Sequence, residues 1–125
     1  MKVGDIYLVK IPASGGHEQQ GVRPAIVVQT SENIERVPTV LIVPFTTQIK
    51  AASFPFTFGV EPDSTNNLTS TSVALVFQLR AIDKKRLKNR IGSLNPDNIA
   101  DFETKSGKYF EVLMTVFLFL VWALG

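Results

Sequence analysis

The stretch GHEQQGVRPAIVV, residues 16–28, decides the fold because a polar, glycine-containing loop leads directly into an apolar segment. Glycine tolerates positive φ and close backbone approach, so the first half predicts a loop. The second half, within RPAIVVQT (23–30), is rich in β-branched residues and predicts a strand. We expect its proline at the first strand position, where no ladder donor is needed. The loop also carries a histidine, a carboxylate, amides and an arginine, so it is a candidate site for ligand binding or proton transfer.

The segments on either side predict further strands. DIYLVKI (5–11) alternates in polarity, and TVLIVPFT (39–46) is continuously apolar, which favours a central strand. FPFTFGV (54–60) would place three phenylalanines on one face of a strand. TSVALVFQLRAI (71–82) predicts a fifth strand.

A helix is predicted after these strands. Asn95 is a suitable N-cap, Pro96 fits the first helical position, and Asp97 favours the positive end of the helix dipole. The helix would run on into an apolar tail. Five or six short strands followed by one helix predict a small β-barrel with a helix packed on it. We therefore expect a single domain over residues 1–125, mainly β (α+β), with a C-terminal helix over 96–125.

The tail VLMTVFLFLVWALG (112–125) carries no charge. Its 14 residues fall short of the roughly 20 that cross a bilayer as a helix. We expect a helix buried in the core or at a subunit interface. A membrane-associated tail and an atypical C-terminus are the alternatives.

The composition excludes several kinds of site. The 125-residue chain has no cysteine and one histidine, which excludes disulfides, a thiolate nucleophile, a Cys-based zinc site and a His-rich metal site within one chain. The lack of cysteine fits the cytosol, and the charged N-terminus predicts no signal peptide. A net charge of +2 is weak evidence for a polyanionic partner.

Three segments carry groups suited to binding or chemistry. The loop before Arg23 could be an ordinary solvated hairpin, but an arginine fork matches a phosphate well. In VPFTTQIK (43–50), hydroxyl and amide donors follow a buried strand, and they could bind a phosphate or simply stabilise the loop. The basic run in QLRAIDKKRLKNR (78–90) is either a solvated surface or a track for a phosphodiester backbone. The phenylalanines of residues 54–58 could stack bases or pack in the core.

Four motifs in this order resemble one known family. GDIYLVKIP (4–12), GHEQQGVRPAIVV (16–28), VPFTTQIK (43–50) and QLRAIDKKRL (78–87) together resemble the MazF/PemK family of toxin endoribonucleases, over about residues 3–94. The resemblance implies an SH3-like (CcdB/PemK-like) barrel that forms a homodimer. It implies a cytoplasmic mRNA interferase that cleaves single-stranded RNA at short sequences, with no metal or cofactor. The implied partners are RNA, a cognate antitoxin and, only together with that antitoxin, operator DNA; we do not expect a membrane partner.

The family's functional positions transfer to this sequence residue by residue. The resemblance gives catalytic roles to Arg23 and Thr46, and to His17 and Glu18 in the loop. RNA contacts are expected at Gln19, Thr47, Gln48, Lys50, Phe56, Gln78, Arg80, Lys84 and Arg86.

The sequence departs from the family in the fifth predicted strand. Many relatives have an acid just before its glutamine, and one branch has an arginine two residues earlier, where this chain has Phe77 and Leu75. The roles of those two groups are therefore missing. A non-catalytic CcdB-like toxin that binds a protein target, and a degenerate family member, are the alternatives.

Overall fold

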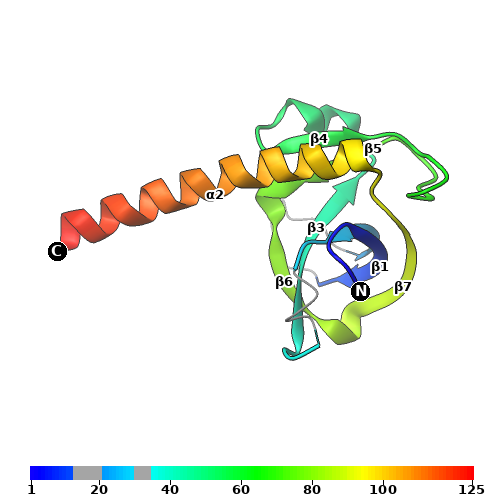
Figure 1. The fold of residues 1–125 in the computed structure, drawn as a ribbon, viewed down its shortest axis with the longest axis horizontal. Helices are drawn as coiled ribbons and strands as arrows, with labels where there is room; N and C mark the ends of the chain where they lie inside the picture. Colours follow the sequence, from blue (N-terminus) through cyan, green and yellow to red (C-terminus); the bar gives the residue numbers. More distant parts are fainter. Residues whose placement is uncertain (13–20, 30–34) are drawn as a thin grey trace.

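The computed structural model describes residues 1–12, 21–29 and 35–125, which form an antiparallel β-sheet with one long C-terminal helix (Figure 1). Its seven strands are β1 (Asp5–Ile11), β2 (Gly21–Val27), β3 (Thr39–Thr46), β4 (Thr57–Val60), β5 (Ser72–Leu75), β6 (Arg80–Asp83) and β7 (Leu87–Ser93). They lie in the order β4-β5-β3-β2-β1-β7, and β6 pairs with β3. The predicted mainly β fold with a terminal helix is confirmed, although the sheet does not close into a complete barrel.

Strand β3 is central, as its continuous apolar sequence predicts. It pairs with β2 on one edge and with both β5 and β6 on the other. Successive side chains point to opposite faces of a strand. Accordingly, Val43 packs in one apolar cluster with Ile6 and Ile26, while Ile42 packs in a second cluster with Val9. Burial on both faces explains why this strand lacks an alternating pattern.

Strand β2 begins earlier than the sequence predicts. It starts at Gly21, whose φ of +85° suits glycine, and Pro24 is its fourth residue and not its first. Pro24 lies opposite Leu8 of β1, but β3 pairs only with Ala25–Val27. At Pro24 the strand therefore has a neighbour on one side only, where a missing N–H is tolerated.

The predicted phenylalanine stripe over 54–60 is wrong in part. Strand β4 covers only Thr57–Val60, and a 3₁₀ turn, η1 (Ile49–Ser53), precedes it. Pro55 cannot donate to a ladder, and Phe56 has a φ of +59°, which is incompatible with a continuous strand. Of the three phenylalanines, only Phe58 lies in the strand, and it is buried.

The predicted fifth strand is two strands separated by a 3₁₀ turn, η2 (Val76–Gln78). Both β5 and β6 run antiparallel to β3. Ala74 pairs with Phe45, and Arg80 pairs with Ile42. The chain thus advances six residues from Ala74 to Arg80, while the facing residues of β3 are only three apart. The extra residues form η2, so two side chains of this turn, Phe77 and Gln78, reach a surface cleft.

Helix α2 (Pro96–Leu124) begins as the sequence predicts. The Asn95 side chain accepts a hydrogen bond from the Asn98 N–H at 2.8 Å, Pro96 follows, and Asp97 lies in the first turn. Ile99, Phe102 and Tyr109 pack against the apolar cluster that contains Ile6. The Tyr109 hydroxyl donates to the Phe77 carbonyl at 3.1 Å, which fastens the helix to η2.

Phe110 still lines a groove with Leu41 and Val76, and the helix then projects away from the sheet body (Figure 1). Every residue from Phe110 to Gly125 is exposed. Of the two locations expected for the tail, the core is therefore wrong, and a subunit interface stays a prediction. The helix is long and apolar enough to cross a membrane by length and composition, and none of its most apolar window is buried.

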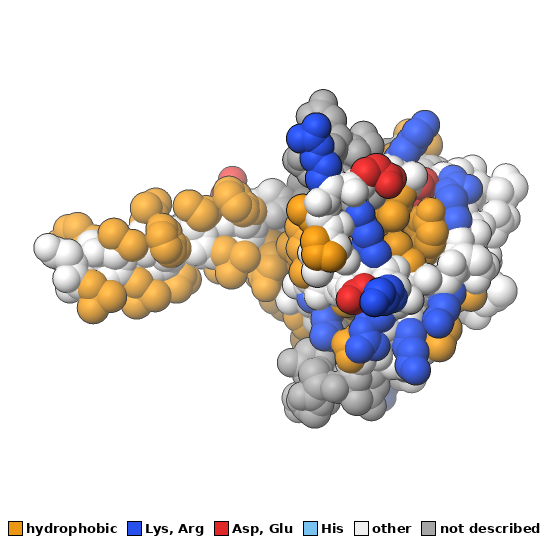
Figure 2. Space-filling view, turned by 90° about the horizontal axis from the view of Figure 1, so that it is seen from below, with side chains coloured by type: hydrophobic (Ala, Val, Ile, Leu, Met, Phe, Trp, Pro, Cys, Tyr) orange, Lys and Arg blue, Asp and Glu red, His pale blue; other side chains and the backbone are white. Residues whose placement is uncertain are grey.

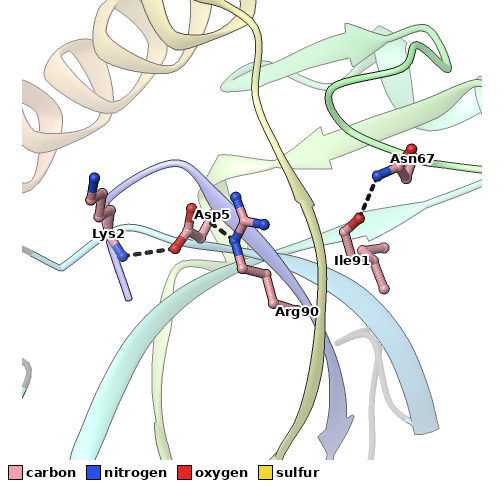
Figure 3. Close-up of polar contacts among 5 residues, drawn as sticks. All are labelled: Lys2, Asp5, Asn67, Arg90 and Ile91. Atoms are coloured by element: carbon pink, nitrogen blue, oxygen red, sulfur yellow. Dashed lines mark hydrogen bonds and ion pairs between the residues drawn. The ribbon is translucent and has the colours of Figure 1, made fainter.

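A polar cluster joins the first strand to the last. Asp5 Oδ1 pairs with Arg90 Nε at 3.3 Å, and Asp5 Oδ2 accepts the Lys2 backbone N–H at 2.8 Å (Figure 3). These contacts hold the bulged β1–β7 pairing, whose register shifts between Ile6 and Val9.

Candidate functional site

Two residues predicted to be catalytic line one small cleft. The β2–β3 ladder ends at the pair Ala25↔Pro44. Continuing the same register by two residues on each strand leads to Arg23 and Thr46. The ladder has stopped there, so the strands separate, and both residues line the cleft of about 260 Å³ that results. The structure thus places Arg23 and Thr46, to which the resemblance gives catalytic roles, in the lining of one cleft.

Thr46 is nearly buried, with 3% of its surface exposed, at the end of β3. Its Oγ1 accepts a hydrogen bond from the Gln48 backbone N–H at 3.1 Å. Because a hydroxyl carries one donor and two acceptor positions, this contact leaves the hydroxyl proton available to donate. Thr47 is exposed and also lines the small cleft.

A tightly bonded loop, residues 61–71, forms the opposite rim of the small cleft. Asp63 Oδ1 accepts from the backbone N–H groups of Asn66 (2.7 Å) and Thr65 (2.9 Å), and Oδ2 accepts from the Asn95 side-chain amide (2.8 Å). The hydrogen bond from Asn66 N–H, followed by that from Asn95, lowers the pKa of the Asp63 carboxyl below its ordinary value. The loop is therefore fixed before any ligand arrives.

Asn67 anchors this rim to β7. Its side-chain amide donates to the Ile91 carbonyl at 2.8 Å, and its φ of +54° is one that asparagine tolerates (Figure 3). Both residues line the small cleft. No functional residue was predicted in this loop from the sequence; the run of hydroxyl residues Thr69–Ser72 was the available signal.

A second, larger cleft of about 700 Å³ shares Thr46 with the first. Four residues predicted to contact RNA line it, namely Gln48, Lys50, Phe56 and Gln78. Its remaining walls are mostly apolar and come from η1, the segment between η1 and β4, the end of β5, η2 and α2. They comprise Ala51, Ser53, Phe54, Pro55, Leu75, Phe77 and Tyr109.

Aromatic rings form much of this larger cleft. Phe54 is 56% exposed and meets Phe77 edge-on, with ring centroids 5.8 Å apart. Phe56 is half-buried, and its ring lies 5.2 Å from that of Tyr109. The RNA contacts predicted from the sequence include Phe56 but not Phe54. Phe77 stands where many relatives have an acid, a departure that the sequence already shows.

The basic residues Arg80, Lys84 and Arg86 line neither cleft. Arg80 begins β6, and the other two lie in a 3₁₀ turn, η3 (Lys84–Arg86), which contacts β1. Figure 2 shows Lys and Arg side chains gathered on one face of the body. The basic residues predicted to bind the RNA backbone therefore lie outside the two clefts that share Thr46.

His17, Glu18 and Gln19 lie outside the residues that the structure describes. Within the described ranges 1–12, 21–29 and 35–125, no group of three or more His, Cys, Asp or Glu side chains is arranged to hold a metal ion.

Comparison with known proteins identifies a family. Residues 2–107 match the family model described as "PemK-like, MazF-like toxin of type II toxin-antitoxin system". The chain is similar to MazF from Deinococcus radiodurans, with TM-score 0.72, 22% identity, and 89% of this chain and 96% of that one covered. It is also similar to the Mycobacterium tuberculosis toxin MazF-mt6, with TM-score 0.70, 18% identity and coverage of 86% and 96%.

A third similar structure is an endoribonuclease in complex with its cognate antitoxin from Mycobacterial species. Its TM-score is 0.69 at 18% identity, and 89% of this chain and 95% of that one are covered. These likenesses show a shared fold, while the family model spans most of the present chain. This protein therefore belongs to the family of PemK-like, MazF-like toxins of type II toxin–antitoxin systems.

Proposed function

We propose that this protein is a metal-independent, sequence-specific endoribonuclease that cleaves single-stranded messenger RNA and is the toxin of a type II toxin–antitoxin pair. The observation that carries the proposal is that Arg23 and Thr46 line the same cleft, two residues beyond the end of the β2–β3 ladder. Family membership and the endoribonuclease named among the similar structures support it.

RNA supplies its own nucleophile, the 2′-hydroxyl. Its attack on the neighbouring phosphorus breaks the bond to the 5′-oxygen and leaves a 2′,3′-cyclic phosphate and a 5′-hydroxyl. The extra negative charge on the phosphorane must be stabilised as it develops. Arg23 presents a planar cation to the non-bridging oxygens, and Thr46 donates its hydroxyl proton to one of them.

Two proton transfers complete the reaction. One group must take the proton of the 2′-hydroxyl, and another must protonate the departing 5′-oxygen. We assign the first role to His17 or Glu18, whose loop leads into β2 two residues before Arg23. Arg23 or His17 delivers the second proton.

The larger cleft gives the RNA a place to bind beside the scissile linkage. Phe54 and Phe77 offer ring faces for unpaired bases, and Gln48 and Gln78 offer amides for base edges. Lys50 adds a cation for the backbone. The basic residues Arg80, Lys84 and Arg86 would attract RNA to the body from outside the two clefts.

The partners follow from the same proposal. MazE–MazF structures from Deinococcus radiodurans are among the similar folds, so we expect a cognate antitoxin whose acidic segment covers the basic face. We expect a cytoplasmic homodimer, and contact with operator DNA only when the antitoxin is bound.

One observation favours a second candidate function. Phe77 occupies the position of an acid in many relatives, and it makes the larger cleft strongly apolar. An apolar cleft of this kind also suits a peptide, so the alternative is a non-catalytic toxin that binds a protein target, in the manner of CcdB.

The test is incubation of the purified full chain with a long RNA in EDTA. We expect cleavage at a short recurring sequence, with 2′,3′-cyclic phosphate and 5′-hydroxyl ends when the fragments are mapped. Arg23→Ala should lose at least about 10²–10³ in rate, the typical effect of removing one preorganised donor. Arg36→Ala, which removes an exposed arginine that lines neither cleft, is the control. Intact RNA with the wild-type chain, or full cleavage by Arg23→Ala, contradicts the proposal.

A pH–rate profile addresses the proton transfers. If His17 supplies or takes a proton, His17→Ala flattens one limb of the profile. An unchanged profile assigns the transfer to Glu18, and Glu18→Gln then removes the limb instead.

A further inference from the structure

The outer part of α2, Val112–Leu124, is an apolar rod that projects from the body and packs on no other described residue of the chain. No Asp, Glu, Lys or Arg occurs from Val112 to Gly125, and every residue of this stretch is exposed. Exposure is 80% at Trp122 and 87% at Leu124. Figure 2 shows hydrophobic side chains along the whole length of the rod. Surface of this kind requires a covering partner in water.

The rod has no polar side that could face water once a protein partner was bound. Thr115 carries its only hydroxyl, and apolar residues occupy all the other angles around the helix. A helix that docks on a protein has an apolar stripe and a polar opposite face, and a second copy of the rod would also cover one stripe only. Hydrocarbon, which surrounds a helix on all sides, is the environment that matches this pattern.

The charges end where the body ends. Phe110 is the last helix residue that lines a groove with the sheet body, and Lys108 and Glu111 on either side of it are the last charged residues. Thirteen helical residues then extend about 20 Å at about 1.5 Å each. That length exceeds one leaflet, about half of a hydrocarbon layer of roughly 30 Å.

We propose that Val112–Leu124 inserts into the hydrocarbon of a lipid bilayer and holds the sheet body, with both clefts, at the membrane surface. This occupant differs from the sequence-based expectation that no membrane is involved. It also goes beyond the proposed function, because it concerns where the body works and does not depend on which reaction the clefts support.

Flotation of the full chain with neutral phosphatidylcholine vesicles tests the proposal. Insertion is driven by apolar burial, so binding should persist at high salt, unlike binding through the basic face. Phe117→Lys and Phe119→Lys provide the sharper test. Two residues apart on a helix means about 200° of rotation, so these side chains lie on nearly opposite sides. In a bilayer each lysine should weaken vesicle binding at least about tenfold. Phe117→Leu and Phe119→Leu, which keep the apolar character, should still float.

The single tryptophan of the chain reports insertion directly, because it lies near the end of the rod. With vesicles, Trp122 emission should shift to shorter wavelength, become shielded from a water-soluble quencher, and be quenched by lipids brominated on their acyl chains. Circular dichroism and thermal unfolding of the lysine variants check that the body stays folded.

Three results overturn the proposal. The first is failure of the chain to float with neutral vesicles, and the second is full accessibility of Trp122 to the aqueous quencher when vesicles are present. The third is a chain that assembles without lipid and loses that assembly through only one of the two lysine variants, which would assign the rod to a second copy. RNA cleavage is measured separately, so either proposal can fail without the other.

Discussion

The backbone N–H of Gln48 donates a hydrogen bond to Thr46 Oγ1 at 3.1 Å, and this contact fixes how the threonine can act. The oxygen is held as an acceptor at the end of β3, in the wall shared by the two clefts. Its proton can then be directed into the small cleft, toward the place where Arg23 would hold a phosphate. The same bond also caps the turn after the strand, so structural and catalytic roles must be separated by experiment.

Substitutions at Thr46 separate those roles. Thr46→Ser keeps the hydroxyl and should retain most of the RNA cleavage. Thr46→Val keeps the shape but removes both the donor and the Gln48 acceptor, so cleavage should fall about 10²-fold. Stability should fall by about 1 kcal/mol, the usual cost of one hydrogen bond. Rates under single-turnover conditions and urea unfolding measure the two effects. Equal rates for the serine and valine variants would show that the hydroxyl has no part in the chemistry.

The larger cleft predicts that Phe54 contributes more to RNA binding than Phe56. Phe54 is 56% exposed, whereas Phe56 packs against Tyr109 and the core. Stacking of a base on an aromatic ring contributes about 1–3 kcal/mol. Phe54→Ala should therefore weaken binding of a 2′-O-methyl RNA about 5- to 150-fold at little cost in stability.

The control is Phe56→Ala. It should lower the melting temperature and affect RNA affinity less, as followed by fluorescence anisotropy below the melting point. If Phe56→Ala reduces affinity more than Phe54→Ala in folded protein, base stacking on Phe54 is ruled out.

How much of this arrangement the sequence predicts depends on the element. The bounds of β1 and β3 follow directly from alternation and from a continuous apolar run. The start of α2 follows from the Asn95 cap. The phenylalanine pattern of 54–60 misled because a positive φ at Phe56 breaks a strand that periodicity alone would continue. A local pattern does not reveal that conformation, in which the Phe56 ring packs against the distant Tyr109.

The candidate site is likewise predicted from the sequence only in part. Motif resemblance selects Arg23 and Thr46, but only the register of β2 on β3 places them at one opening. The apolar side of the larger cleft forms because η2 interrupts the pairing of β5 and β6 with β3, and because Tyr109 of α2 contacts η2 through the Phe77 carbonyl. These are contacts between distant segments, and spacing along the chain does not encode them.

The pH dependence of stability should show the carboxylate of Asp63. Hydrogen bonds from Asn66 and Asn95 hold its pKa below the ordinary value of 3.8. The folded state therefore binds this proton less readily than the unfolded state does. Its stabilising effect is fully present above the unfolded pKa and is lost as pH falls through the lower folded pKa.

Asp63→Asn should lower the free energy of unfolding at neutral pH, and the difference from wild type should shrink below about pH 4. Urea unfolding across the acid range measures this difference. Asp97→Asn, in the first turn of α2, is the control for a general loss of negative charge. A difference between Asp63→Asn and wild type that stays constant down to the acid limit would show that these hydrogen bonds do not favour the ionised form.

The close approach of β7 to the cleft rim predicts that Gly92 cannot be replaced. A Cβ on Gly92 would lie 2.5 Å from the backbone carbonyl oxygens of Thr65 and Asn66, which cannot move without breaking the Asp63 hydrogen bonds. Gly92→Ala should therefore cost about 1–3 kcal/mol of stability. It should also displace the rim and reduce cleavage. Gly59→Ala is the matched control, because nothing lies within 4 Å of its added carbon, and its effect should stay within about 0.5 kcal/mol. Thermal unfolding of the two variants side by side decides the matter, and equal melting temperatures would show that the rim yields to the extra methyl group.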